Sequence, residues 1–200
     1  MSSPTPRWFT DHGPGHADWY VNRFRNLAAQ GADLAGEARL VDALVPPASR
    51  ILDAGCGPGR VGAVLAERGH QVTGVDVDPI LIEAARQDHP GSTWLVANLA
   101  ELDLLGPGQE PFDAAVLAGN VMVFLGPGTE TTVLGRVAAQ LRPNGRIIVG
   151  FGLDRGYPLA EFDHHIATAG LRLEHRFAAW DLVAFHDQAD FAVTVLRTPA

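Results

Sequence analysis

Apolar and polar positions along residues 49–151 follow two alternating periods, one typical of buried strands and the other of helices. Short apolar runs predict strands at residues 50–53, 71–75, 93–97, 113–118 and 146–151. Runs with helical spacing lie between most of them and predict helices at residues 61–68, 79–88 and 128–141. Strands that alternate with helices indicate right-handed crossovers, and therefore a parallel, doubly wound sheet.

The pattern changes near the end of the chain. A helix is predicted at residues 159–169, residues 171–177 alternate apolar and polar side chains, and residues 191–196 form another strand. Because no helix separates these last two strands, they must pair antiparallel or nearly so. We therefore expect an α/β fold with a doubly wound, seven-stranded, mostly parallel sheet and a C-terminal antiparallel hairpin. The segment around Trp180 is either a flap beside a substrate or an extension of that hairpin.

The first 48 residues have helical spacing and predict an N-terminal helical cap. One helix is expected at residues 16–30, and Asp33 is a candidate cap for a second helix that runs to residue 45. We expect residues 1–200 to form one domain, in which the cap covers a core of residues 49–200.

The first of these helices places His16, Tyr20, Arg23 and Leu27 on one face, because they are spaced at i, i+4, i+7 and i+11. Three of these side chains can form hydrogen bonds, which favours a lid over a bound ligand. Ordinary amphipathic docking of the helix, with the polar groups at its edge, is the alternative.

A glycine loop follows the first predicted strand of the core. Gly55, Gly57 and Gly59 lie between that strand and a helix, so the backbone can turn tightly and approach a ligand closely. With Gly62 they match the dinucleotide pattern G-x-G-x-x-G, and the loop could hold a dinucleotide or another adenosine-containing cofactor. Asp53, at the end of the strand, would repel a pyrophosphate and attract an ammonium group.

A second acidic residue, Asp76, ends the next strand, about 20 residues after the first glycine of the loop. A carboxylate at this position can accept hydrogen bonds from both hydroxyls of a ribose, which fits either kind of cofactor.

Several motifs of the chain resemble those of the class I S-adenosylmethionine-dependent methyltransferases. The similar segments are residues 51–59, 74–79, 96–102, 112–120 and 141–149. Asn98 stands where the family usually has aspartate, but its side-chain oxygen can still accept a hydrogen bond from an adenine amine. The resemblance implies a Rossmann-like core, S-adenosylmethionine as the cofactor, and methyl transfer as the reaction.

The motifs and the lid helix together predict the cofactor-binding residues. They are Tyr20, Arg23, Asp53, Gly55, Cys56, Gly57, Gly59, Asp76, Val77, Asn98, Leu99 and Ala118. Among them, the resemblance places Asp76 at the ribose and Val77 against the adenine.

Transfer of a sulfonium methyl group depends mainly on alignment of the reacting atoms, so the acceptor must approach the same edge of the sheet. The residues expected to face it are Trp19, Asn120, Met122, Phe151 and Arg155. Of these, Arg155 could hold an acidic acceptor. His16 is the candidate general base for an acceptor that keeps its proton near neutral pH.

The composition of the chain excludes some reactions and argues against some binding partners. All 15 basic residues are arginine, and with 23 acidic residues they give a formal net charge of −8. The absence of lysine excludes Schiff-base chemistry and a phosphate-binding lysine of the Walker type. The negative charge and scattered arginines argue against a nucleic-acid partner and favour a small-molecule acceptor.

Other features of the chain bear on its compartment and on metals. The single Cys56 and the lack of a signal-peptide or membrane-spanning pattern predict a cytoplasmic protein without a membrane partner. The adjacent His164 and His165 would point about 100° apart on a helix, so we expect no metal site there.

Two other functions are compatible with the pattern. One is an NAD(P)-binding oxidoreductase that uses Gly57, Gly59 and Gly62, although Asp53 and the final hairpin argue against it. The other is a protein that binds S-adenosylmethionine without catalysing transfer.

Overall fold

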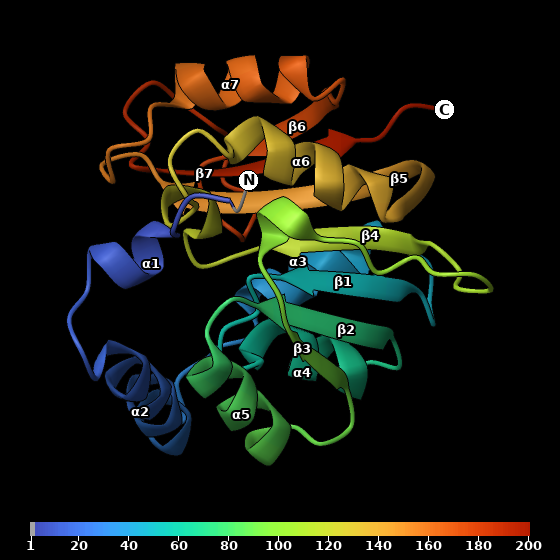
Figure 1. Ribbon diagram of the computed structural model, residues 1–200. Helices are drawn as coiled ribbons and strands as arrows, with labels where there is room; N and C mark the ends of the chain where they lie inside the picture. Colours follow the sequence, from blue (N-terminus) through green and yellow to red (C-terminus); the bar gives the residue numbers. More distant parts are fainter. Residues whose placement is uncertain (1–2) are drawn as a thin grey trace.

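Seven strands form one sheet in the order β3-β2-β1-β4-β5-β7-β6 in the computed structural model, which describes residues 3–200 (Figure 1). The strands are β1 Arg50–Ala54, β2 Gln71–Asp76, β3 Thr93–Val96, β4 Phe112–Leu117, β5 Leu141–Gly152, β6 Arg172–Phe177 and β7 Phe191–Arg197. The first five pair parallel, whereas β7 lies antiparallel between β5 and β6. The predicted mostly parallel sheet with an antiparallel ending is therefore confirmed.

Helices precede the sheet and connect its strands. They are α1 Arg7–Thr10, α2 His16–Ala29, α3 Gly36–Leu44, α4 Arg60–Glu67, α5 Pro79–Asp88, α6 Glu130–Ala139 and α7 Leu159–Thr168, with 3-10 turns η1 Leu99–Glu101 and η2 Val121–Val123. The strands of the sheet interior are apolar along their length because both faces are covered. In β5, for example, Ile147 packs with the cluster that contains α6 and α7, and Ile148 with the cluster that contains α3 and α4.

Two predicted boundaries are wrong for local reasons. Asp33 does not cap α3, which begins at Gly36; its carboxylate instead accepts a hydrogen bond from the Ala35 N–H (3.1 Å) and pairs with Arg39 (2.7 Å). The strand β5 begins at Leu141 and not at residue 146 as predicted, and the residues between contain an irregularity where Asn144 has a left-handed backbone (φ 57°).

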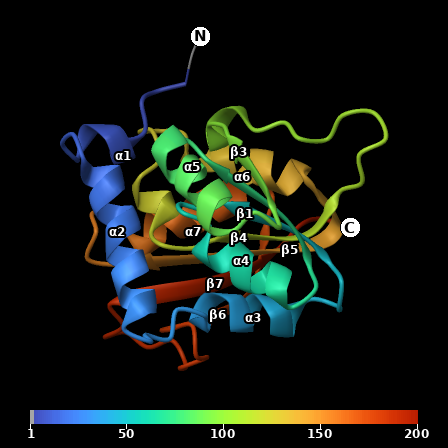
Figure 2. The same cartoon turned by 90° about the horizontal axis from the view of Figure 1, so that it is seen from below.

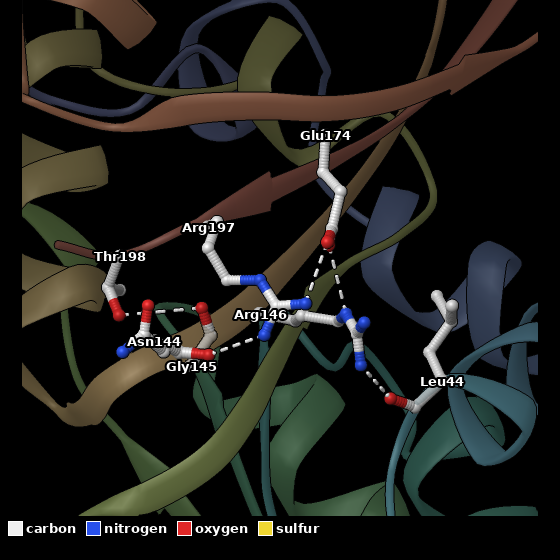
Figure 3. Close-up of polar contacts among 7 residues, drawn as sticks. All are labelled: Leu44, Asn144, Gly145, Arg146, Glu174, Arg197 and Thr198. Carbon is white, nitrogen blue, oxygen red and sulfur yellow. Dashed lines mark hydrogen bonds and ion pairs between the residues drawn. The ribbon is translucent and has the colours of Figure 1, made fainter. Parts of the chain in front are cut away.

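One ion network joins the closing hairpin to the body of the sheet. Glu174 on β6 accepts hydrogen bonds from the Arg197 Nη2 on β7 (2.7 Å) and the Arg146 Nε on β5 (3.0 Å), as Figure 3 shows. Arg146 also donates to the carbonyl oxygen of Leu44, the last residue of α3. These hydrogen bonds hold the pKa of Glu174 at about 2, although its partial burial acts in the opposite direction. The network therefore connects three strands and one helix through a single carboxylate.

We expect Glu174→Gln to lower the free energy of unfolding by about 1–2 kcal/mol, because two charge-assisted hydrogen bonds become weaker. The pKa of Glu174 is lower in the folded chain than in the unfolded one, so its contribution is complete above the unfolded pKa and is lost as the pH falls toward about 2. Denaturant unfolding of both proteins at neutral and acidic pH measures this effect, and the difference between them should shrink in acid.

Glu67→Gln is the matched control, since Glu67 is exposed and forms no ion pair among residues 3–200. An equal loss in both variants, or a Glu174→Gln deficit that persists at low pH, would contradict the assigned contribution of the network.

Candidate cofactor and acceptor site

The loop between β1 and α4 requires glycine for two separate reasons. Gly55, Gly57 and Gly59 all have left-handed backbone angles (φ 78°, 54° and 85°), which residues with a Cβ atom rarely adopt. Space is also short, because a Cβ atom at Gly55 would lie 2.4 Å from Val121 and one at Gly59 would lie 2.9 Å from Trp94. The loop can therefore expose its backbone only with glycines at these places.

Trp94 on β3 supports this loop from behind, which the sequence pattern does not reveal. The side chain is 3% exposed and its indole N–H donates to the His89 carbonyl oxygen (2.8 Å). Cβ atoms at Gly59, Gly62 and Gly74 would all come within 3 Å of this ring. The glycine after the loop and the glycine within β2 thus make room for one buried tryptophan.

Two buried carboxylates hold the loop through its backbone N–H groups. Asp53 Oδ2 accepts from Gly62 N (2.9 Å), and Asp76 Oδ2 accepts from Gly57 N (2.8 Å). Asp76 also accepts from Asp78 N through Oδ1 (3.0 Å). Within the described part of the chain, neither carboxylate forms an ion pair with an arginine or histidine.

Burial of these carboxylates disfavours their charged form. The exposed fractions are 1% for Asp53 and 9% for Asp76. Burial raises the pKa of Asp53 to about 7 and that of Asp76 to about 6, even though the backbone N–H groups act in the opposite direction. Two uncompensated acids at one sheet edge are suited to a ligand with a positive charge and hydroxyl donors.

An inner pocket opens at the carboxyl ends of β1, β2 and β4. Ten of the predicted cofactor-binding residues line it: Tyr20, Asp53, Gly55, Cys56, Gly57, Asp76, Val77, Asn98, Leu99 and Ala118. Gly59 does not line the pocket but packs behind the loop on Trp94, and Arg23 lies outside the pocket, in the cleft described below. Burial raises the pKa of the Cys56 thiol well above its ordinary value, so Cys56 stays protonated.

Asn98, which the resemblance predicts to lie at the adenine, already serves a local structural purpose. Its side-chain oxygen accepts a hydrogen bond from Ala100 N (3.0 Å) and so caps η1. One lone pair of that oxygen remains for a further donor, because an amide oxygen accepts two hydrogen bonds.

The segment before α2 covers the inner pocket, and sequence reasoning missed it. Trp8 and Pro6 line the pocket, and the Trp8 indole N–H donates to Asp78 Oδ2 (2.8 Å), two residues after Asp76. The backbone N–H of Trp8 donates to the Phe124 carbonyl oxygen (3.3 Å). No helical period marks this segment, because α1 is only four residues long.

The helix α2 combines the two interpretations that its sequence allows. Ala17 and Val21 are buried and pack against Leu81 and Ala84 of α5, which is ordinary helix docking. Tyr20 points to the inner pocket and meets the Trp8 ring edge-on at 5.5 Å. Ala17 and Val21, which dock α2 on α5, and Tyr20, which faces the inner pocket, therefore lie on neighbouring faces of the helix.

A wider outer cleft continues from the inner pocket, and the two cavities share Trp8, Tyr20, Phe24, Arg60, Gly119 and Phe124. Among the residues predicted to face the acceptor, Trp19, Asn120 and Arg155 line this cleft, as do His16 and Arg23. Trp180 also lines it, so the segment between β6 and β7 borders the cleft. In both views α1 and α2 lie to one side of the sheet (Figures 1 and 2), and residues of α2 line the cleft together with residues of the loops after β5 and between β6 and β7.

The prediction that Met122 and Phe151 face the acceptor is wrong. Both belong to the apolar core, with exposed fractions of 1% and 0%. Phe151 points to the α7 side of the sheet and meets Phe162 edge-to-face at 5.1 Å, because neighbouring residues of a strand face opposite sides. The turn η2 likewise directs Met122 inward, and Phe124 reaches the cavities instead.

Two histidines stack at the outer cleft. The rings of His12 and His16 are nearly parallel, with centroids 3.7 Å apart. His12 Nδ1 lies 3.1 Å from the Trp8 carbonyl oxygen, an acceptor only, so this nitrogen carries the hydrogen and Nε2 keeps its lone pair when the ring is neutral. Burial and the neighbouring His12 lower the pKa of His16.

The adjacent histidines of α7 lie elsewhere. His165 Nδ1 is 2.7 Å from the Tyr157 hydroxyl, and neither His164 nor His165 lines the two cavities. Over residues 3–200, no three histidine, cysteine or acidic side chains gather as a metal ion would require. The same residues include no helix that is long and apolar enough to cross a membrane.

Comparisons with known proteins agree with the fold. The profile of a family described as a methyltransferase domain matches residues 51–145. The uncharacterized methyltransferase YodH of Bacillus subtilis is 32% identical over 167 residues, which cover 80% of this chain and 70% of that protein. The magnesium-protoporphyrin O-methyltransferase of Rhodobacter capsulatus is 30% identical, and the match spans 62% of this chain and 54% of that protein.

Among solved structures, a TehB-like SAM-dependent methyltransferase from Corynebacterium glutamicum superposes with a TM-score of 0.85 and 42% sequence identity, covering 93% of this chain and all of that one. The predicted cofactor S-adenosylmethionine and the predicted methyltransferase activity are confirmed by these relatives, which favour neither the NAD(P) alternative nor a non-catalytic binding protein. The chain therefore belongs to the class I S-adenosylmethionine-dependent methyltransferase family.

Proposed function

We propose that this enzyme methylates a small molecule held in the outer cleft, while the inner pocket holds S-adenosylmethionine. The observation that carries the proposal is the junction of the two cavities, where Trp8, Tyr20 and Phe124 border both. A methyl group in the inner pocket and an acceptor in the outer cleft would meet at this junction. We further propose that residues 1–200 act as one domain, with residues 1–48 as its cap.

The inner pocket suits the cofactor in its charge and in its close backbone approach. In the proposed assignment, the buried and unpaired Asp53 faces the ammonium group, and Asp76 accepts from the ribose hydroxyls. Val77 lies against the adenine, while Asn98 and Leu99 meet its polar edge. Gly55, Cys56, Gly57 and Ala118 contribute closely spaced backbone, and Tyr20 covers the pocket.

S-adenosylmethionine supplies an electrophilic methyl group on a positively charged sulfur. The contribution of the chain is to align the acceptor at about 3–3.5 Å from that carbon and to exclude water. The aromatic residues Trp8, Tyr20 and Phe124 suit the second purpose, because they separate the junction from solvent with apolar surface.

The histidine pair is our candidate for proton removal, where the acceptor needs it. The sequence suggests His16 alone, and the geometry adds His12, whose Nε2 is left as a base by the hydrogen bond at Nδ1. The lowered pKa of His16 favours the neutral form of its ring, which is the form that accepts a proton.

Relatives support an acceptor of small size. The matched proteins include the magnesium-protoporphyrin O-methyltransferase and a ubiquinone biosynthesis O-methyltransferase of Xylella fastidiosa, which is 29% identical over 74% of this chain. A ribosomal protein L11 methyltransferase also matches, but this chain spans only 34% of its length. The net charge of −8 and the scattered arginines argue against a nucleic-acid acceptor.

Two measurements test the proposed function. Calorimetry should detect binding of S-adenosylhomocysteine and no binding of NADH, since the buried Asp53 would oppose a pyrophosphate. Labelled S-adenosylmethionine should then release S-adenosylhomocysteine with at least one member of a panel of small metabolites. Heat from NADH alone would refute the cofactor assignment, and turnover only with protein or nucleic-acid acceptors would refute the acceptor class.

Asp76→Ala should weaken the binding of S-adenosylhomocysteine at least about tenfold, because hydrogen bonds from a ribose to a charged group are lost. Calorimetric titration of the folded variant measures this change. Asp103→Ala is the matched control, because Asp103 is exposed, does not line the pocket and should bind like the native protein. Unchanged affinity in Asp76→Ala would show that the ribose is bound elsewhere.

The affinity for S-adenosylhomocysteine should fall as the pH decreases through about 7, because Asp53 then takes up a proton and loses its attraction for the ammonium group. One pH unit below this pKa, binding should be roughly tenfold weaker than well above it. Titrations from about pH 6 to pH 8.5 measure the profile.

Asp53→Asn separates this charge from other groups that titrate. The variant should bind weakly at every pH, and the decrease near pH 7 should be absent from its profile. The same decrease in the variant and in the native protein would assign it to another group.

A further inference from the structure

We infer that the outer cleft selects a flat aromatic acceptor that carries a carboxylate. The inference rests on the proposed function, since it concerns the acceptor that this cleft would present to the inner pocket. Two independent features support it, the aromatic lining of the cleft and the arginines that its own acids leave unpaired.

Indole rings dominate the walls of the cleft. Three of the four tryptophans of the chain line it: Trp8, Trp19 and Trp180. Trp19 is 55% exposed although it is a large apolar side chain, and its ring lies over His16 with centroids 5.2 Å apart. Exposed aromatic surface inside a cleft is covered best by another flat ring, because stacking contributes beyond the area that it buries.

Most of the acidic residues of the cleft are already neutralised. Glu37 receives hydrogen bonds from both terminal nitrogens of Arg60, the first at 2.8 Å. Asp33 receives two from Arg39, at 2.8 and 2.7 Å. Because each acid forms a bidentate pair with an arginine, neither Glu37 nor Asp33 contributes much negative charge to the cleft.

Two arginines of the cleft remain available. Arg23 has no carboxylate within 4.0 Å among residues 3–200, and its guanidinium lies over the rings of Trp19 and Phe24 at 5.7 and 5.6 Å. Arg155 approaches only Asp154, at 3.6 Å without a hydrogen bond, and both side chains are more than half exposed. The stacking positions Arg23 in advance, which lowers the cost of ordering it around a ligand.

Asp190 is the remaining acid of the cleft. It is exposed, and no ion pair holds its carboxylate within the described residues. Among the residues that line the cleft, two guanidinium groups stand against one unpaired carboxylate, and the exposed Asp154 beside Arg155 offsets this excess only in part because it forms no hydrogen bond with it. An arginine recognises a planar carboxylate through paired N–H donors, so an acidic acceptor fits this excess.

The two arginines come from different elements that line the cleft. Arg23 belongs to α2, whereas Arg155 belongs to the loop after β5, and Figure 2 shows α2 running past that end of the sheet. A ring in the cleft could direct its carboxylate to either arginine and its nucleophilic atom to the junction at Trp8 and Tyr20. The cleft therefore favours an aromatic acid over a neutral ring of the same shape.

The test compares 4-hydroxybenzoate with its neutral isostere 4-hydroxybenzamide, with and without S-adenosylhomocysteine. Quenching of tryptophan fluorescence, checked by calorimetry, gives the affinity of each probe. The proteins are the native chain, Arg23→Gln, Arg155→Gln and the double variant. Arg172→Gln is the matched control, since Arg172 is exposed at the far end of β6 and does not line the cleft.

We expect the acid to bind about fivefold tighter than the amide, a preference typical of partly exposed charge pairs. Each single variant should reduce the preference, the double variant should abolish it, and Arg172→Gln should keep it. Equal binding of the two probes, no binding of either at millimolar concentration, or a preference that survives in the double variant would overturn the inference.

The affinity for S-adenosylhomocysteine separates this result from the proposed function. It should be the same in all five proteins, because neither Arg23 nor Arg155 lines the inner pocket. Loss of that binding in the native chain would refute the cofactor site, whereas the probe titrations without S-adenosylhomocysteine would still report on the cleft. Normal cofactor binding without preference for the acid would refute the acceptor class alone.

Discussion

The structure depends on two buried carboxylates that accept hydrogen bonds from the backbone of one glycine loop. Asp53 holds Gly62 N and Asp76 holds Gly57 N, so the ends of β1 and β2 determine the path of the chain between β1 and α4. An acid taken out of water without a cation is costly. The two carboxylates therefore lower the stability of the free chain, and a ligand with a positive charge and hydroxyl donors would offset that cost when it binds.

This arrangement explains the surroundings of the loop. The buried ring of Trp94 fills the space beneath three glycines. Trp8 closes the other side through its hydrogen bond to Asp78, which itself donates its backbone N–H to Asp76. Trp8 and Asp76 are thus connected by two consecutive hydrogen bonds. The inner pocket extends from the sheet edge to Pro6 and Trp8.

The fold and the inner pocket could be predicted from the sequence because they depend on local patterns. Strand and helix periods gave the sheet, and Asp53, Asp76 and the loop glycines follow one another in short motifs. The outer cleft could not be predicted in the same way, since it is assembled from α2, η2 and loops whose orientations no period determines. For this reason Met122 and Phe151 were wrongly predicted to face the acceptor. No pattern in the sequence pointed to His12 or Trp8 as residues of the cavities. Trp94 was identified only as a strand residue, because its three glycine partners are distant in sequence.

The position of β7 between β5 and β6 has a consequence for synthesis. A chain that emerges from the ribosome with its amino terminus first presents β5 and β6 before the strand that joins them. Until β7 follows, the edge of β5 offers unpaired backbone groups, and the apolar residues beneath α7 have an incomplete partner. The parallel strands β1 to β5 can pair before β7 is made, but β5 and β6 are joined into one sheet only when β7 is inserted between them. A nascent chain that has not yet added β7 therefore carries an open β5 edge with which another chain can pair.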